Sequence, residues 1–260
     1  MKIPFTKAHG AKNDFLLTWA SEIPSGDLIP FARAICDRHT GPGADGWLIV
    51  YPGSGDCHGQ IRLFNSDGSE PEISGNGTRC AAAFLIEAGL ADSDITILTG
   101  AGRKQLRLME RAGNRYLFEM NMGSPSVEEV QGTLLGLPVT IVNVGNPQCA
   151  VFVDDFELDW RAIGARIESH ARFPNRTNVS FVKVIDEHTI DVRFFERGVG
   201  ETMSSGTGST GAAAAAIARQ AVQPPVKIET PAGPLSLRVH GNDLYLVGPA
   251  EIVVKGEFFL

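Results

Sequence analysis

Two short stretches carry the same pattern and decide how this chain of 260 residues folds. They read SGNGTRCAAAFLI (74–86) and SGTGSTGAAAAAI (205–217). Each begins with a serine, continues through a Gly-X-Gly turn and ends in a run of small apolar residues. Serine is a favoured helix N-cap and alanine is the strongest helix former, so a helix is expected to begin just after each serine. The alanine runs predict that both helices are closely packed on both sides.

The rest of the chain repeats with the same spacing. Ser205 lies 131 positions after Ser74, and this offset maps ITILTGAGRKQLRL (95–108) onto VKIETPAGPLSLRV (226–239) without a gap. A shared offset through turn, helix and strand patterns indicates duplication. The predicted fold class is therefore α+β, with two pseudo-symmetric domains that each wrap a mixed or antiparallel sheet around a central helix.

The boundary between the two domains is expected where Gly, Ser, Pro and acidic residues interrupt the strand pattern, in MNMGSPSVEEVQG. This gives an N-terminal domain over residues 1–122 and a C-terminal domain over residues 123–260. The return of the extreme C-terminal segment to the first domain is left open.

Composition excludes several classes of function. The net charge is −7 and no Lys/Arg-rich block occurs, which argues against a nucleic-acid partner or an anionic membrane surface. No leader-like apolar segment and no run of about 18 apolar residues is present, so we expect a cytoplasmic protein without a membrane span. The four cysteines lack CxxC spacing and the six histidines lack HxxxH spacing. We therefore expect reduced, packed cysteines and no metal site.

The paired turns suggest chemistry at a carboxylate. Each serine hydroxyl is expected to lie beside backbone N–H groups that have no partner within the helix, and such groups attract anions. Taken singly, Ser74 or Ser205 is explained by capping alone. Taken together, a pseudo-two-fold axis predicts both hydroxyls across one interdomain cleft, with one as base and one as acid at the α-carbon of a bound amino acid.

Several motifs give the chain a specific resemblance. In order along the sequence they are HGAKNDF, CDRHTGPGADG, FNSDGSEPEISGNGTRC, VGNPQC, FFERGVGETMSSGTGS, TPAGPLSL and VGPAEIVVKGE. Over essentially its whole length the chain resembles the diaminopimelate epimerase family, within the proline racemase-like superfamily. The resemblance implies a cofactor-independent isomerase that interconverts LL- and meso-diaminopimelate by proton transfer at Cα, in lysine and cell-wall precursor synthesis.

The resemblance also implies the site residues and partners. The catalytic positions correspond to Ser74 and Ser205. The substrate-binding positions correspond to Asn13, Asn65, Gly75, Asn76, Gly77, Asn146, Asn178, Glu196, Arg197, Gly206, Thr207 and Gly208. Arg197 is suited to a bidentate carboxylate contact and Glu196 to an ammonium group. The alternative without a functional role is that FFERG forms a surface ion pair at the end of a strand. The expected ligand is a small amino acid, with no metal, no organic cofactor and a homodimer as the assembly.

The chain departs from the family at the chemistry itself. The family carries cysteine where this chain has Ser74 and Ser205, and a hydroxyl is a far poorer base than a thiol. Gln148 stands where the family usually has histidine. No histidine or lysine that would activate either serine is identifiable nearby in sequence. His9 and His39 are interpreted as structural or supporting residues, and Cys80 as a packing residue.

Four interpretations remain open from the sequence. The leading one is an epimerase or racemase with serines at the catalytic positions. A second is a related enzyme that performs dehydration or isomerisation with a single proton step, and a third is a catalytically silent amino-acid-binding protein. The fourth is that the two serines replace cysteines of the natural chain.

Overall fold

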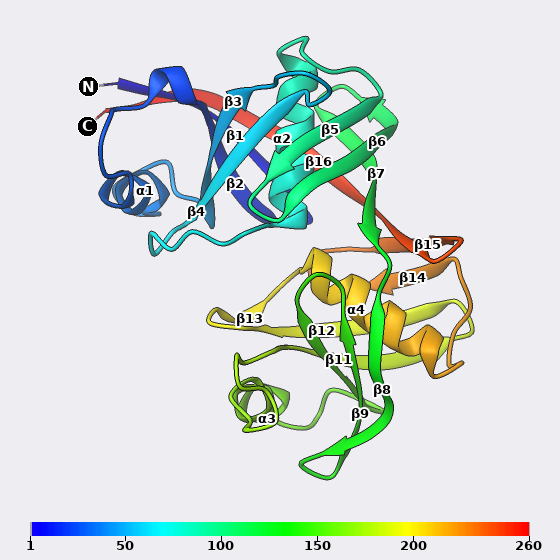
Figure 1. Ribbon diagram of the computed structural model, residues 1–260. Coiled ribbons are helices and arrows are strands. Elements are labelled where there is room, and N and C mark those ends of the chain that lie inside the picture. The colour runs from blue at the N-terminus through cyan, green and yellow to red at the C-terminus, as the bar shows by residue number, and fades with distance from the viewer. Residues whose placement is uncertain (1, 260) are drawn as a thin grey trace. The chain divides into compact units, whose positions relative to one another are not determined.

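The computed structural model describes residues 2–259 and divides the chain into two compact units. Unit 1 comprises Met1–Met120 and Gly248–Leu260, and unit 2 comprises Asn121–Val247. Strands β7 (Arg115–Gly123) and β16 (Asp243–Phe259) contain residues of both units (Figure 1). The sequence-based division after residue 122 falls within β7, and the last strand begins in unit 2 and ends in unit 1.

Unit 1 is a closed barrel around one helix. Its further strands are β1 (Lys2–Gly10), β2 (Asn13–Trp19), β3 (Gly46–Pro52), β4 (Gly59–Asn65), β5 (Asp94–Thr99) and β6 (Gly102–Ala112). These strands follow one another in the sheet, then β7 and β16, and the pairing of β1 with β16 closes the ring. The β2–β3 and β4–β5 pairs are parallel, whereas β1–β2, β1–β16, β3–β4, β5–β6 and β6–β7 are antiparallel, so the sheet is mixed.

Helix α2 (Gly75–Glu87) fills this barrel. It contacts β1, β2, β3, β4 and β5, and every residue from Gly75 to Leu85 is buried. The small side chains of the helix allow strands to approach it closely on several sides. The buried first turn is therefore fixed by the surrounding sheet, and this turn carries Ser74.

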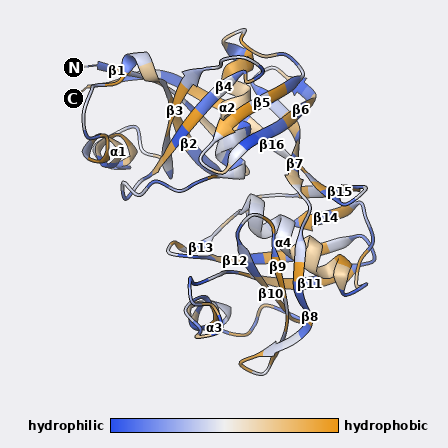
Figure 2. Cartoon of the chain, in the orientation of Figure 1, coloured by the Kyte–Doolittle hydropathy of each residue, from blue (hydrophilic) through white to orange (hydrophobic). Residues whose placement is uncertain are grey.

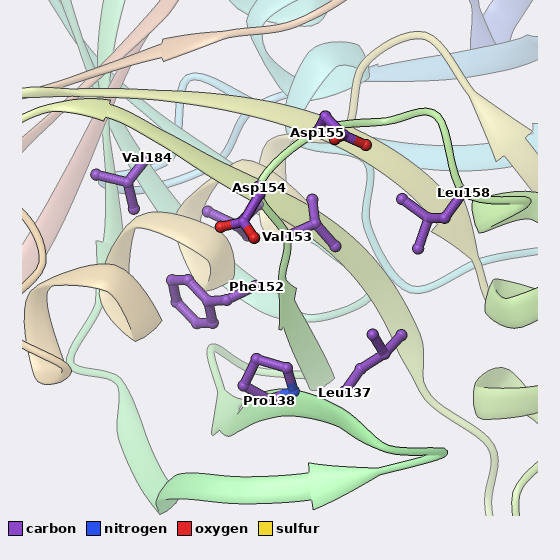
Figure 3. Close-up of a pocket in the computed structure, with 9 residues that line it drawn as sticks. Leu137, Pro138, Phe152, Val153, Asp154, Asp155, Leu158 and Val184 are labelled. Atoms are coloured by element: carbon purple, nitrogen blue, oxygen red, sulfur yellow. The ribbon is translucent and has the colours of Figure 1, made fainter.

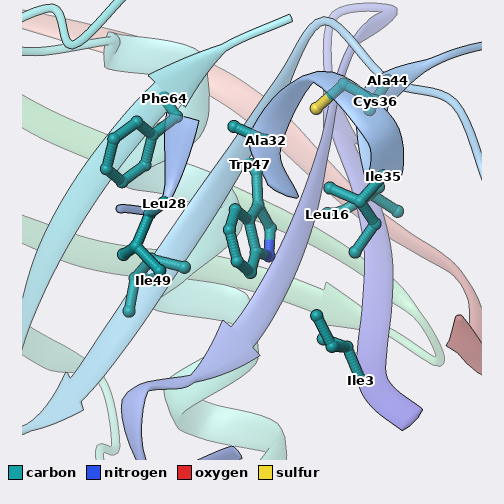
Figure 4. Packing of buried hydrophobic residues seen from close by; sticks show 10 residues of the cluster. All are labelled: Ile3, Leu16, Leu28, Ala32, Ile35, Cys36, Ala44, Trp47, Ile49 and Phe64. Atoms are coloured by element: carbon teal, nitrogen blue, oxygen red, sulfur yellow. The ribbon is translucent and has the colours of Figure 1, made fainter. Parts of the chain in front are cut away.

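A second apolar layer lies between the barrel and helix α1 (Ile29–Cys36). Its members are Ile3, Leu16, Leu28, Ala32, Ile35, Cys36, Ala44, Trp47, Ile49 and Phe64 (Figure 4). The indole Nε1–H of buried Trp47 donates to Thr18 Oγ1 at 2.9 Å, which satisfies the polar atom of an otherwise apolar side chain. A short 3-10 turn, η1 (Ala20–Glu22), precedes α1.

Unit 2 repeats the arrangement around helix α4 (Gly206–Ala218). Its strands are β8 (Ser126–Leu134), β9 (Leu137–Asn143), β10 (Pro147–Phe152), β11 (Asn178–Asp186), β12 (Thr189–Glu196), β13 (Gly200–Thr202), β14 (Val226–Glu229) and β15 (Leu235–His240). The sheet order runs β16-β15-β14-β12-β11-β10-β9-β8, with β13 on β12. Helix α3 (Trp160–Glu168) contacts β11 and β12, and α4 contacts strands from β8 to β15.

The duplication predicted from the offset of 131 is confirmed by the elements. The offset maps the bounds of α2 onto those of α4, and the first residue of α1 onto the first residue of α3. The parallel pairs β10–β11 and β12–β14 of unit 2 correspond to β2–β3 and β4–β5 of unit 1. Hydrophilic and hydrophobic residues both occur along the strands of the two units (Figure 2), and buried and more exposed residues alternate along β5 and β7. The predicted α+β class with a central helix in each half is therefore correct.

The cysteine prediction holds for three of the four residues. Cys36, Cys80 and Cys149 are buried and free, but Cys57 is free and partly exposed in the turn between β3 and β4. Burial raises the pKa of each of the three buried thiols to about 12, so they remain neutral. Among residues 2–259, no helix is long and apolar enough to cross a membrane.

Candidate active site

Both predicted serines cap the central helix of their unit. Ser74 has an extended backbone, and its Oγ accepts the N–H of Gly77 at 3.1 Å. Ser205 is likewise extended, and its Oγ accepts the N–H of Gly208 at 3.0 Å. The capping expectation is therefore confirmed at both positions. In each cap the oxygen is the acceptor, so its own hydroxyl proton is free to be donated elsewhere.

Glycine is required behind the second cap. A Cβ added to Gly208 would lie 2.8 Å from Phe194 Cδ1 and 2.9 Å from the Cβ and Oγ of Ser205. Any larger residue would displace the hydroxyl or the ring, because the site is packed on that side. At Gly77 the corresponding approach to Ser74 Cβ is 3.3 Å, which is less severe.

Ser205 donates its hydroxyl proton to a carboxylate. Its Oγ lies 2.8 Å from Glu196 Oε2, and the other carboxylate oxygen accepts the hydroxyl of Thr202 at 2.7 Å. Glu196 is the last residue of β12 and pairs with Gly200, so the β12–β13 hairpin brings the carboxylate back beside the helix that follows. Ser205 is 4% exposed. This hydroxyl therefore has both a hydrogen-bond donor and a proton acceptor in a nearly closed environment.

Burial sets the protonation of this carboxylate. Burial raises the pKa of Glu196, and the hydrogen bonds from Thr202 and Ser205 lower it by a smaller amount. A carboxylate whose pKa is raised is a stronger proton acceptor than a solvated one. The pair Ser205–Glu196 is therefore suited to transfer of a proton from the hydroxyl to the carboxylate.

Ser74 has no such partner among the described residues. The offset of 131 places Asn65 where unit 2 has Glu196, and Asn65 Nδ2 donates to Ser69 Oγ at 2.9 Å instead. Ser74 lines a cavity of about 190 Å³ whose charged members are Arg62, Glu70 and Glu72. Arg62 and Glu70 form an ion pair with a shortest N–O distance of 2.7 Å, and Glu72 has no hydrogen bond to Ser74 among the described contacts. The two capping serines therefore have different chemical surroundings.

A line of amide side chains lies at the first turn of α2. Asn76 Nδ2 donates to Asn13 Oδ1 at 3.1 Å, and Asn13 Nδ2 donates to Asp45 Oδ2 at 2.7 Å. Behind them, Arg79 Nη2 donates to Asn76 Oδ1 at 2.5 Å. The structure thus brings together three of the predicted unit 1 residues, Ser74, Asn13 and Asn76, at one end of the helix.

A similar line lies at the first turn of α4. Gln148 Nε2 donates to Asn146 Oδ1 at 2.8 Å, and Asn146 Nδ2 lies 3.4 Å from Thr207 Oγ1. Gln148 is 1% exposed, and its Oε1 has no partner in the described part of the chain. Gln148 therefore supports Asn146 as a neutral group.

Asn178 and Arg197 meet at the end of β12. Asn178 Oδ1 accepts the backbone N–H of Arg197 at 3.1 Å, and its Nδ2 donates to Pro147 O at 3.1 Å. The Arg197 side chain is exposed, and its Nη1 donates to Asn175 O at 3.3 Å. Within residues 2–259 its guanidinium has no carboxylate partner, so a surface ion pair does not describe FFERG.

Other candidates lie apart from the serines. His9 Nε2 is 4.0 Å from Glu251 Oε2, and the backbone N–H of His39 donates to Asp37 Oδ1. In the described part of the chain, neither histidine has a hydrogen bond or ion pair with Ser74 or Ser205. Residues 2–259 contain no group of three or more His, Cys, Asp or Glu side chains placed to hold a metal ion.

A cavity of unit 2 lies apart from this site. It measures about 480 Å³ and is lined by Leu137, Pro138, Phe152, Val153, Asp154, Asp155, Leu158, Val182 and Val184 (Figure 3). None of the predicted site residues lines it. The candidate site is therefore assigned from the helix caps rather than from cavity size.

Sequence reasoning missed the contact between Ser205 and Glu196. It placed Glu196 on the substrate ammonium and sought a histidine or lysine as the activating partner. The available signal was the turn RGVG between Glu196 and Glu201, which folds the strand back over four residues. A carboxylate at the last position of the first strand then lies near the segment that follows the second strand.

Comparison with known proteins identifies the family. The family model described as diaminopimelate epimerase matches residues 5–128 and 140–253. The chain is 38% identical to the diaminopimelate epimerase of Pelotomaculum thermopropionicum over 275 residues, covering 98% of each protein. It is also 38% identical to the enzyme of that name from Synechococcus elongatus, covering 100% of this chain and 99% of the relative.

Solved structures show the same fold at low sequence identity. A PhzF-family phenazine biosynthesis protein from Bacillus anthracis has a TM-score of 0.75 at 16% identity, with complete coverage of both chains. A hydroxyproline epimerase from Agrobacterium vitis has a TM-score of 0.73 at 14% identity, covering 98% of this chain and 92% of that one. With the full-length sequence matches and this shared fold, the chain belongs to the diaminopimelate epimerase family of isomerases.

Proposed function

We propose that this chain is a cofactor-independent epimerase that moves protons at the α-carbon of diaminopimelate, converting the LL form to the meso form. The observation that carries the proposal is the hydrogen bond from Ser205 Oγ to Glu196 Oε2, in a member of this family. A serine becomes a useful base when a neighbouring group accepts its proton. Glu196 supplies that acceptor, which answers the main objection to serine at this position.

The proposed reaction begins at Ser205. Its Oγ takes the α-proton of the substrate while its own proton passes to Glu196 Oε2. The negative charge left on the substrate spreads into its carboxylate, and N–H groups at the first turn of a central helix are suited to stabilise it. Inversion further requires a proton donor for the opposite face of the α-carbon, and the family resemblance gives that role to Ser74. Glu196 then releases its proton to water and Ser74 regains one, so the cycle closes with no net change.

The substrate-binding assignments belong to the same proposal. Asn13, Asn65, Asn76, Asn146 and Asn178 supply amide groups, and the backbones of Gly75–Gly77 and Gly206–Gly208 with Thr207 supply N–H donors. Arg197 is assigned to the distal carboxylate because its exposed guanidinium has free donors. Both oxygens of Glu196 already accept hydroxyl groups, so we assign Glu196 to proton transfer rather than to the substrate ammonium.

One alternative is supported by a specific observation. Ser74 has no proton acceptor or donor chain among the described side chains, whereas Ser205 has one. A reaction with a single proton step, such as isomerisation of a carboxylic acid, would need only the Ser205–Glu196 pair. This alternative predicts exchange of the α-proton without inversion.

Incubation of LL- and meso-diaminopimelate in D2O, followed by proton NMR, separates these cases. The epimerase proposal expects loss of the α-proton signal together with appearance of the other stereoisomer. Exchange without inversion would support the single-proton alternative. Binding without any exchange would show a silent amino-acid-binding protein.

Cellular role and assembly extend the proposal. A cytoplasmic enzyme of lysine biosynthesis is supported by the family alone, and a bacterial mutant that lacks diaminopimelate epimerase tests it by complementation. Activity that survives exhaustive treatment with a chelator supports the absence of a metal. Light scattering tests the proposed homodimer against a monomer.

A further inference from the structure

Arg79 of α2 is a fully buried arginine with an incomplete set of partners. Its side chain is 0% exposed, its Nε donates to Pro249 O at 3.0 Å, and its Nη2 donates to Asn76 Oδ1 at 2.5 Å. Its Nη1 is buried and has no hydrogen-bond partner in the described part of the chain. Within residues 2–259, no ion pair with Asp or Glu involves this guanidinium. Such a group is expensive to bury unless something else compensates its charge.

The guanidinium remains charged at neutral pH. Burial lowers the pKa of Arg79 to about 10, which still leaves it protonated. The neighbouring thiol of Cys80 does not compensate the charge, because burial raises its pKa to about 12. The carboxylates of Asp14 and Asp45 are both bonded to Arg38. The positive charge of Arg79 therefore has no dedicated counter-ion among the described side chains.

This charge lies at the anion-attracting end of the helix. Helical side chains lean toward the N-terminus, and the bond to Asn76 places the guanidinium against the first turn. In that turn, the backbone N–H of Gly77 donates to Ser74 Oγ and that of Thr78 donates to Ser74 O. The N–H groups that precede them are the ones an anion binds. The N-terminal end of the helix and the unpartnered Nη1 of Arg79 are independent observations, and both indicate an anionic ligand.

Unit 2 lacks the equivalent charge. The offset of 131 maps Arg79 onto Thr210, a neutral buried residue whose Oγ1 donates to Gly206 O at 2.8 Å. Gln148, which is buried and donates to Asn146 beside that helix, is also neutral. The two helix ends are therefore electrostatically unequal, although their backbones are alike.

We propose that Arg79 is a positioning residue whose buried charge makes the first turn of α2 the principal carboxylate-binding end of the site, with the α-carboxylate of the substrate as its counter-ion. This assignment of Arg79 rests on the proposed function only where it names diaminopimelate as the ligand that supplies the carboxylate. The charge holds Asn76, which in turn contacts Asn13, and it stabilises the extra negative charge that develops on the carboxylate after proton loss.

The test compares two substitutions at Arg79 by calorimetry with meso-diaminopimelate and with its α-carboxamide. Arg79→Met removes the charge at similar volume, and Arg79→Lys retains it. We expect Met to weaken meso-diaminopimelate binding by about 30-fold or more, as removal of one member of a buried charge pair does. We expect the affinity of the Arg79→Lys variant for meso-diaminopimelate to stay within a few-fold of that of the parent. We expect the α-carboxamide to bind the parent and the Arg79→Met variant with equal affinity. Equal binding of meso-diaminopimelate by the parent and the Met variant would overturn the proposal.

A second variant keeps the proposal testable if Arg79→Met fails to fold. Asn76→Asp introduces a carboxylate at the atom that already accepts Arg79 Nη2, so it supplies an internal counter-ion. We expect a higher unfolding temperature without ligand, together with weaker binding of meso-diaminopimelate. Because Asn76 is itself assigned to the substrate, the unfolding temperature is the deciding readout for this variant. An unchanged or lower unfolding temperature would show that the charge of Arg79 needs no counter-ion and would refute the proposal.

Failure of the proposed function is distinguishable from failure of the Arg79 assignment. A panel of glycine, proline, glutamate and meso-diaminopimelate is scored by the rise in unfolding temperature of the parent and of Arg79→Met. A rise with another amino acid that disappears in the Met variant supports Arg79 while rejecting diaminopimelate as the substrate. A rise that is equal in both proteins, or no rise with any carboxylate, overturns the assignment of Arg79.

Discussion

Replacement of Glu196 by glutamine tests the proton-transfer step directly. Glutamine keeps the shape of the side chain and an oxygen that accepts the hydroxyl of Ser205, but it does not take up the proton. Because Ser205 Oγ lies 2.8 Å from the carboxylate, the expected loss is that of a positioned general base. Such a loss lowers the rate about 10²- to 10⁴-fold, or about 3 to 5 kcal/mol in the barrier. The KM for diaminopimelate should change little, since the substitution leaves the helix caps intact.

The assay is the rate of α-proton exchange in D2O, with KM measured in parallel. Glu201→Gln is the matched control, because Glu201 lies in the same hairpin but pairs with exposed Arg161 at 2.6 Å. The control should retain the parental rate. A Glu196→Gln enzyme with a normal kcat would show that Ser205 is not activated by this carboxylate. A normal kcat with a raised KM would instead return Glu196 to the substrate ammonium.

The same substitution is expected to change how the stability of the protein depends on pH. The folded-state pKa of Glu196 is raised by burial, so the folded protein holds this proton at pH values where the unfolded chain has released it. Stability therefore falls as the pH rises from the ordinary glutamate pKa through the folded-state pKa. Glu196→Gln removes that dependence and should raise the unfolding temperature at neutral pH. The activity of the parent should rise over the same interval, because the ionised form is the acceptor.

Three further substitutions give independent tests. Ser74→Cys combined with Ser205→Cys should raise epimerisation by orders of magnitude, because a thiol ionises far more readily than a hydroxyl, and a parental rate equal to that of the double variant would contradict this. Gly208→Ala should lower the free energy of unfolding by about 1 to 3 kcal/mol in a denaturant titration, since the new methyl group would lie 2.8 Å from Phe194, whereas an unchanged midpoint would show that the ring moves freely. Arg197→Ala should weaken diaminopimelate binding in calorimetry while leaving proline binding unaltered, and an unchanged heat would show that Arg197 does not contact the distal carboxylate.

The duplicated fold was predictable because it rests on local patterns that repeat. The serine caps, the Gly-X-Gly turns and the alanine runs each have a local physical cause, and their shared offset joins them into a repeated unit. The closure of unit 1 was not predictable, because it depends on β1 pairing with β16 across almost the whole sequence. Register between strands so distant in sequence has no local signature.

The candidate site was predictable in its residues but not in its contacts. Ser74, Ser205 and the surrounding amides follow from the turns and from the family resemblance. The bond between Ser205 and Glu196 depends on how the β12–β13 hairpin turns, and the isolation of Arg79 depends on the residues that surround it in three dimensions. Both are properties of side-chain packing, which a single sequence does not specify.

Duplication of one unit normally yields two equivalent half-sites, yet inversion at carbon does not require them to be equivalent. The offset of 131 places Asn65 against Glu196 and Arg79 against Thr210. Near the start of its central helix, each unit therefore has one ionisable side chain that the other unit lacks at the equivalent position. In unit 1 it is the buried cation of Arg79 beside α2, and in unit 2 it is the carboxylate of Glu196 beside α4. A cation favours the bound carboxylate and the charge that develops on it, whereas a carboxylate favours removal of a proton. The serine at α2 is then a poor base but an adequate donor, and the serine at α4 is the better base. We therefore expect proton removal to be faster from the face that meets Ser205, so that LL- and meso-diaminopimelate should exchange their α-protons at unequal rates.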